Sequence, residues 1–233
     1  MRKFLKKYFP FVLTFFNVYA RYKYKDKSTQ QVFDSIYASN SWEGDESVSG
    51  QGSDLEQTEV VRGELPKIIE KFDIKSILDA PCGDHYWISQ VDLKDIKYTG
   101  ADIVQELIDR TAKKYPEKNF IQLDLVSDSM ESYDLVFVRD CFVHLSQENI
   151  LKALNNIKKS NSTYLLTTTF PEKTKNMDIV TGGWRWLNFQ EAPFNFPEPL
   201  YVFNEKCTEG KKFTDKSMGL WKISDFPDHE VKA

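Results

Sequence analysis

The most informative segment for the fold is Ser76-Ile77-Leu78-Asp79-Ala80-Pro81-Cys82-Gly83-Asp84. It begins with a short apolar run, which is typical of a strand buried in a parallel sheet. An aspartate ends the run, and a glycine follows four residues later. Glycine lets the backbone turn tightly and approach a ligand closely. The stretch therefore predicts a buried strand that leads into a ligand-binding turn.

Strands and helices alternate beyond residue 30, as in a mostly parallel sheet covered by helices on both faces. The expected strands are Ser76–Ala80, Tyr98–Ile103, Phe120–Leu125, Tyr133–Arg139, Thr163–Phe170, Leu200–Asn204 and Gly219–Ile223. Apolar stripes predict helices over Gln105–Tyr115 and Gln147–Lys159, the second with Ser146 as its N-cap. The run Ser53-Asp54-Leu55-Glu56 resembles a capping box that opens a helix toward Phe72.

Length and composition limit the classes of protein. The chain has 233 residues, 41% of them apolar, which is room for one large α/β domain. Its net charge of −4 argues against nucleic acid as a partner. The three cysteines, Cys82, Cys141 and Cys207, stand far apart and form no CxxC pair. We therefore expect no metal site, no disulfide framework and a cytoplasmic location.

Aspartates end four successive predicted strands, namely Asp79, Asp102, Asp124 and Asp140. Ligands of open α/β sheets bind at the carboxyl ends of the strands, so these residues should face one crevice. Asp102 could accept hydrogen bonds from both hydroxyls of a ribose. Asp124 could receive an adenine amino group, beside the backbone N–H of Leu125. Each aspartate alone is more often a cap or turn residue, and it is the set of four that points to a binding site.

These residues resemble class I S-adenosylmethionine-dependent methyltransferases, and more narrowly a bacterial subgroup associated with surface-glycan biosynthesis. The resemblance covers about Phe33 to Ile223. It is carried by residues 78–84, Gly100-Ala101-Asp102-Ile103, residues 139–145, residues 47–53 and Gly183-Trp184-Arg185. It implies a Rossmann-like fold whose seven-stranded, mostly parallel sheet has one antiparallel edge strand. The first loop departs from the family's glycine-rich pattern at Pro81-Cys82 and His85-Tyr86.

The implied cofactor is S-adenosylmethionine, with S-adenosylhomocysteine as product. The resemblance implies that Asp79 and Gly83 lie against the methionine part, Asp102 against the ribose and Asp124 near the adenine. The residues expected to bind the cofactor are Trp42, Ser53, Asp79, Cys82, Gly83, Asp102, Ile103, Asp124, Leu125 and Arg139.

Catalysis requires that acceptor and methyl group be aligned and that a hydroxyl acceptor lose its proton. His144, just after the fourth strand, is the preferred general base because its pKa lies near working pH. Asp140 could orient the imidazole, contact the cofactor amino group or hold the loop. His85 is a weaker candidate, His229 lies in the tail, and a lone histidine such as His144 often only caps or packs.

Two irregular segments complete the expected site. Residues 42–53 could be a mobile linker, and we favour a lid over the cofactor. Residues 171–199 predict a substrate insert, in which Trp184 would stack on a sugar face and Arg185 would bind phosphate or carboxylate. The alternative is an aromatic mini-core, which Phe189, Phe194 and Phe196 fit better.

Residues 1–30 form a separate basic and apolar segment, expected to be helical, ahead of the single domain over residues 31–233. The alternatives are a helix packed on the domain or a partner, an interfacial helix on acidic lipid, and a cleaved signal peptide. The protein could thus be peripheral to the inner face of a membrane.

The leading hypothesis is an O-methyltransferase acting on a sugar, nucleotide-linked sugar or phosphorylated glycan precursor. An inactive methyltransferase-like binding module, tethered to a membrane or biosynthetic assembly, is the alternative. An NAD-dependent oxidoreductase is disfavoured because no GxGxxG follows the first strand. Composition and motifs leave the oligomeric state open.

Overall fold

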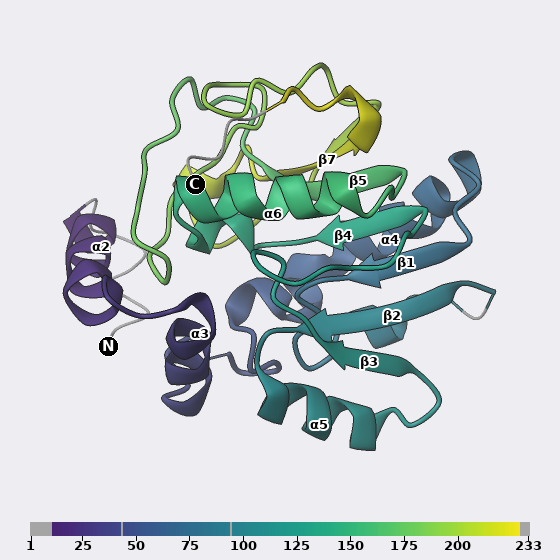
Figure 1. The fold of residues 1–233 in the computed structure, drawn as a ribbon, viewed down its shortest axis with the longest axis horizontal. Helices are drawn as coiled ribbons and strands as arrows, with labels where there is room; N and C mark the ends of the chain where they lie inside the picture. The colour runs from purple at the N-terminus through teal and green to yellow at the C-terminus, as the bar shows by residue number, and fades with distance from the viewer. Residues whose placement is uncertain (1–10, 43, 94, 229–233) are drawn as a thin grey trace.

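The computed structural model describes residues 11–42, 44–93 and 95–228, which form a seven-stranded sheet between helices (Figure 1). The strands are β1 (Ser76–Asp79), β2 (Lys97–Asp102), β3 (Asn119–Gln122), β4 (Leu135–Val138), β5 (Tyr164–Thr169), β6 (Tyr201–Asn204) and β7 (Ser217–Lys222). Their order is β3-β2-β1-β4-β5-β7-β6. The seven predicted strands and the mostly parallel, Rossmann-like sheet are confirmed.

The antiparallel strand is β7, which pairs with β5 on one side and with β6 on the other. It lies one position inside the edge, because β6 occupies the edge itself. The prediction of one antiparallel strand is therefore right, but its placement at the edge is wrong.

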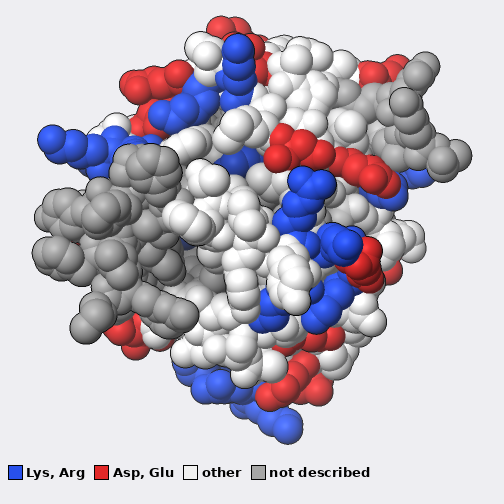
Figure 2. Space-filling view, turned by 90° about the vertical axis from the view of Figure 1, so that its left-hand side faces the viewer, with Lys and Arg blue, Asp and Glu red and all other residues white. Residues whose placement is uncertain are grey.

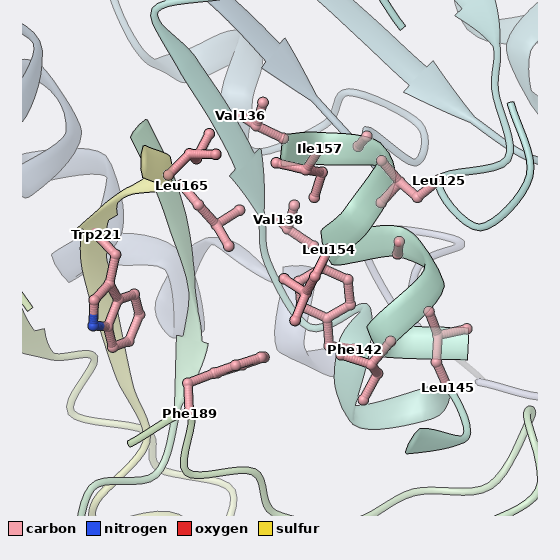
Figure 3. Close-up of a cluster of buried hydrophobic side chains, with 14 of the residues drawn as sticks. Leu125, Val136, Val138, Phe142, Leu145, Leu154, Ile157, Leu165, Phe189 and Trp221 are labelled. Carbon is pink, nitrogen blue, oxygen red and sulfur yellow. The ribbon is translucent and has the colours of Figure 1, made fainter. Parts of the chain in front are cut away.

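Helices cover both faces of the sheet. The helices on the faces are α4 (Leu55–Lys71), α5 (Gln105–Lys114) and α6 (Gln147–Lys159), and two further helices, α2 (Phe11–Tyr24) and α3 (Thr29–Ala38), precede them in the chain. Successive strand residues point to opposite faces. Leu78 of β1 therefore joins the core beneath α6, whereas its neighbour Ile77 joins the core beneath α4. Figure 3 shows the first of these cores, in which Val136 and Val138 of β4 face Leu154 and Ile157 of α6.

Helix caps confirm one expectation and correct another. The Ser146 hydroxyl accepts the Asn149 N–H at 3.2 Å, as predicted for the start of α6. The capping box expected at Ser53 is wrong, because Ser53 ends a short 3₁₀ turn and Asp54 is the N-cap of α4. Glu46, from further upstream, accepts the Leu55 N–H at 2.7 Å. A distant carboxylate thus caps this helix.

The insert over residues 171–199 contains no regular helix or strand and packs through aromatic side chains. Phe189, Phe194 and Phe196 are buried with Trp221 of β7. In Figure 3, Phe189 lies on the β7 side of the α6 core. The aromatic mini-core is therefore confirmed for these three residues, and it gives the irregular insert a fixed scaffold.

The N-terminal helices α2 and α3 lie at the end of the sheet toward which β1, β2 and β4 point (Figure 1). Ala20 and Tyr24 of α2 are buried against Val32 and Ile36 of α3. Among the described residues, no helix has the length and apolar character needed to cross a membrane. Residues 1–10, Glu43 of the expected lid and His229 lie outside the described residues.

Candidate active site

A cavity of about 140 Å³ opens at the carboxyl ends of β1, β2 and β4. Asp79, Asp102, Asp124 and Asp140 all line it, as the positions of the strand ends predict. The ten residues expected to bind the cofactor also line this cavity, and so does His144. The tertiary structure thus brings together segments from residue 42 to residue 144.

Two of these carboxylates are buried beside the cavity. Asp79 accepts the Tyr98 hydroxyl at 2.6 Å, and Asp102 accepts the backbone N–H groups of Val104 at 3.0 Å and Gly83 at 3.3 Å. Burial raises the pKa of Asp79 to about 7 and that of Asp102 to about 6. A ligand that brings hydroxyl or ammonium donors would offset the desolvation of both carboxylates. The residues present therefore fit the ribose and amino acid parts of the implied cofactor.

Asp124 lines the cavity and also stabilises the turn that follows β3. Its carboxylate accepts the Val126 N–H at 2.9 Å and the Ser127 hydroxyl at 3.2 Å. Burial raises its pKa. These local bonds fix the loop after β3, and they leave Asp124 fewer free lone pairs than Asp79 for a ligand.

The expected lid is hydrogen-bonded to the loop after β1. The Ser47 hydroxyl donates to Asp84 at 2.8 Å, and the Val48 N–H donates to the same carboxylate at 3.2 Å. Gly83 has φ of +55°, and a Cβ built there would lie 2.1 Å from the Ser49 hydroxyl oxygen. Only glycine therefore allows this close approach of the lid to the first loop.

A cluster of four charges, three of them buried and that of Asp140 half-buried, supports the cavity wall. Arg139 donates to Glu205 at 2.7 Å and to the carbonyl of Gly52, in the lid, at 2.8 Å. Lys216 lies 2.5 Å from Asp140 and 3.3 Å from Glu205. Such groups stay charged in the interior only when they are paired. The cluster therefore ties the lid and β4 to the segments around β6 and β7.

Glu205 and Lys216 were missed by the sequence analysis. Each is a charged residue directly beside a strand, after β6 and before β7. That position was the only signal, and it is equally typical of a solvent-exposed turn.

Asp140 does not orient the imidazole, contrary to one of the roles expected for it. Its carboxylate is bound by Lys216 and lies 3.6 Å from Arg139, and these cations hold its pKa at about 2 against the effect of burial. Its backbone has φ of +54°, which is costly for a residue with a side chain. The ion pairs and the backbone together fix Asp140 in the cavity wall.

His144 is oriented by the insert. Its Nδ1 lies 2.8 Å from the carbonyl oxygen of Gly183. Because a carbonyl only accepts, Nδ1 carries the proton, and Nε2 presents a lone pair. The pKa of His144 is lowered, chiefly by burial and against the effect of this hydrogen bond. The ring is therefore neutral and basic near neutral pH, and it lies beside Trp42, with 5.2 Å between the ring centroids.

A second cavity, of about 510 Å³, adjoins the first. Both are lined by Trp42, Ser49, Gly52, Asp140 and His144. The wall of the second cavity combines aromatic rings with charges of both signs. These lining residues are Phe16, Phe170, Trp184 and Phe213, then Asp54, Glu56, Glu209, Lys212 and Lys216. We call this second space the acceptor cavity.

The two expected substrate-binding residues have different positions. Trp184 lines the acceptor cavity and also makes edge contacts with Phe170 and Phe213. Arg185 is only 2% exposed and lines neither cavity. Its guanidinium donates to the carbonyl oxygens of Phe142 at 2.9 Å and Met177 at 3.1 Å. The prediction for Arg185 is therefore wrong, because its guanidinium faces inward and binds backbone carbonyls through Nε and Nη1.

His85 lies outside both cavities, against the weaker expectation that it acts as a base. Its Nδ1 is 3.1 Å from the Tyr98 hydroxyl, which in turn donates to Asp79. Burial lowers its pKa to about 4. His85 therefore supports Asp79 through Tyr98. Within the described residues, no group of three or more His, Cys, Asp or Glu side chains could hold a metal ion.

A family model described as a methyltransferase domain matches residues 77–161, the span from β1 to just beyond α6. The four aspartates and His144 all lie inside that span. Together with the strand order, this match makes residues 77–161 similar to methyltransferase domains of Rossmann-like fold.

Solved structures share the fold at low identity. N-methyltransferase NodS from Bradyrhizobium japonicum WM9, in complex with S-adenosyl-L-homocysteine, is 13% identical, with 80% of this chain and 97% of that chain covered and a TM-score of 0.58. Phosphoethanolamine N-methyltransferase 1 from Haemonchus contortus is 13% identical, with 83% and 48% covered and a TM-score of 0.56.

Some matched chains are longer than the aligned region. The protein spans 56% of the PH0226 protein from Pyrococcus horikoshii OT3, at 16% identity over 47% of its own length and a TM-score of 0.41. It spans 57% of another matched chain. No curated protein matches the chain significantly.

Proposed function

We propose that the protein transfers the methyl group of S-adenosylmethionine to a hydroxyl oxygen of a small polar acceptor, with His144 as general base. The acceptor class that we infer is a sugar, a nucleotide-linked sugar or a phosphorylated glycan precursor. One observation carries the proposal: His144 lies in the wall shared by the two cavities and is held with Nδ1 protonated.

The first cavity would hold the cofactor, which supplies an electrophilic methyl group. Asp102 would accept hydrogen bonds from the ribose hydroxyls. Asp79 and Gly83 would lie against the methionine part, and Asp124 with Leu125 near the adenine. The support for this assignment is that all these residues line one cavity and that Asp79 and Asp102 are buried carboxylates.

His144 would take the acceptor proton at Nε2. The Gly183 carbonyl stabilises the protonated ring through Nδ1–H, and Asp140 adds a nearby negative charge that raises the pKa of His144. Both groups therefore favour the imidazolium that forms as the hydroxyl loses its proton.

The acceptor cavity would bind the acceptor through aromatic faces and cations. Trp184 and Phe213 offer flat apolar surfaces of the kind on which sugar rings stack. Lys212 and Lys216 are the cations in its wall, so they replace Arg185 as the groups that would meet a phosphate.

An amine acceptor is the second candidate. Besides Asp140, which is paired with Lys216, the carboxylates of Asp54, Glu56 and Glu209 line the acceptor cavity and would attract an ammonium group. His144 would then remove the ammonium proton before transfer. The two candidates share the cofactor site and differ only in the acceptor atom.

Calorimetric titration with S-adenosylhomocysteine comes first, followed by transfer of a labelled methyl group to panels of sugar and amine acceptors. Transfer to a hydroxyl that His144→Asn slows would support the proposal. Asparagine keeps a donor for the Gly183 carbonyl and is not basic. The variant therefore distinguishes a role of His144 as proton acceptor from a purely structural role. Transfer only to amines would favour the second candidate. Cofactor binding without any transfer would favour the binding-module alternative.

A further inference from the structure

Helix α2 is apolar on two sides, and the described residues of its inner side pack on the rest of the chain. Ala20 and Tyr24 are buried against α3, and Phe16 lines the acceptor cavity. Asn17 exchanges two hydrogen bonds with the backbone of Trp184, at 2.8 and 2.9 Å. These contacts fix α2 on the insert and determine which of its faces points outward.

The outer side carries four large apolar residues that no part of the described chain covers. Phe15 is 73% exposed, Val18 62%, Tyr19 56% and Tyr22 86%. Their spacing of three, four and seven residues places them in one stripe along the helix. They are four of the seven most exposed large apolar residues in the described part of the chain. We call Phe15, Val18, Tyr19 and Tyr22 the outer stripe.

The charge of the same segment is strongly one-sided. Residues 1–25 contain seven Lys and Arg residues and no Asp or Glu, although the whole chain has a net charge of −4. Arg21, Lys23 and Lys25 come from the described part of this segment. Figure 2, which views the molecule from the α2 and α3 side, shows an uncharged central surface bordered by side chains of both charges.

We propose that α2 docks on an anionic lipid surface, with the outer stripe in the headgroup region and the basic residues on the lipid phosphates. Exposed apolar residues beside cations are what an interfacial helix requires, because apolar burial and attraction to anionic lipid add together. The surrounding acidic protein would be repelled by such a surface, so the positive charge of residues 1–25 orients the contact. Docking holds the acceptor cavity, which Phe16 helps to line, close to the headgroups.

The test is flotation of the full chain with phosphatidylcholine vesicles, with and without 30% phosphatidylglycerol. We expect about tenfold or more stronger binding to the anionic vesicles, weakened by 0.5 M salt. The double variant Val18→Glu/Tyr22→Glu should lose that binding at least about tenfold. Met177→Glu/Val202→Glu removes two exposed apolar residues outside α2 and should bind like the wild type.

Equal binding to neutral and anionic vesicles, or unchanged binding by the outer-stripe variant, would overturn the proposal. Loss of all binding on removal of residues 1–10, with the stripe variant unaffected, would also overturn it. A dimer in light scattering that only the stripe variant abolishes, without vesicle binding, would assign the stripe to a second copy instead. The unfolding midpoint and S-adenosylhomocysteine affinity of each variant report whether it is folded. The result of the vesicle assay does not depend on whether methyl transfer is found.

Discussion

The Nδ1 atom of His144 lies 2.8 Å from the carbonyl oxygen of Gly183, a residue 39 positions further along the chain. The insert thereby sets the tautomer of the imidazole in the wall between the two cavities. A second bond, from the Gly182 N–H to the His144 carbonyl at 2.8 Å, holds the same two segments together. The orientation of the candidate base thus depends on a loop outside the segment matched by the family model.

His144→Ala should slow methyl transfer by roughly 10²- to 10⁴-fold, because the acceptor proton then has no positioned base. Cofactor affinity should stay close to that of the wild type. The wild-type rate should rise with pH through the pKa of His144, which lies below its ordinary value of 6.5, and then level off. The test is to measure the rate of methyl transfer by the wild type and the variant between about pH 5 and 8. If the rate of the variant still rises with pH in the acidic range, His144 is not the base.

Asp102→Ala should weaken S-adenosylhomocysteine binding by about 1–3 kcal/mol, the usual loss when a charged hydrogen-bond partner is removed. Burial raises the pKa of Asp102 to about 6, so wild-type affinity should increase as the pH rises through that value and the carboxylate ionises. Calorimetry at several pH values should show this increase in affinity with pH in the wild type and not in Asp102→Asn. Unchanged affinity in the alanine variant would show that Asp102 does not hold the ribose.

Asp79→Asn should stabilise the ligand-free protein at pH 8 and stabilise it less at pH 5. Burial raises the pKa of Asp79 from 3.8 to about 7, so the native state binds this proton more tightly than the unfolded chain does. That contribution to stability is present at low pH and is lost as the pH rises through about 7. The amide never ionises and can still accept the Tyr98 hydroxyl.

We expect a gain of roughly 1–3 kcal/mol at pH 8 for Asp79→Asn, from urea unfolding at the two pH values. The same variant should bind S-adenosylhomocysteine more weakly. A loss of stability at pH 8 would show that hydrogen bonds and nearby charges offset the desolvation cost of the ionised Asp79 carboxylate.

Arg185→Met should destabilise the fold by about 2–4 kcal/mol, since the Phe142 and Met177 carbonyls lose their donors in the interior. Lys175→Met, an exposed position in the same insert, is the matched control and should change stability by about 0.5 kcal/mol or less. Urea unfolding separates the two positions. A fully stable Arg185→Met protein would contradict the scaffold position of this guanidinium.

Local sequence was enough to predict the parts of the fold that depend on periodicity. Helix α6 was predicted with its observed bounds, and its N-cap Ser146 was identified. Both signals, the apolar stripe and the cap, are formed by residues close together in the sequence. The cap of α4 was misplaced because its partner, Glu46, reaches it from outside the local window. The position of β7 inside the edge depends on which strands pair, and no local pattern encodes that pairing.

The alternation of strands and helices, the aspartates at the strand ends and the place of the first cavity were all predictable from the sequence. Those features follow from local periodicity and from the geometry common to parallel sheets. Three contacts became visible only in the folded chain: Gly183 holds His144, Lys216 holds Asp140, and Arg185 faces inward. Each of these depends on where a buried polar group finds its partner, and that partner lies 39, 76 or, for Arg185 and Phe142, 43 residues away along the chain.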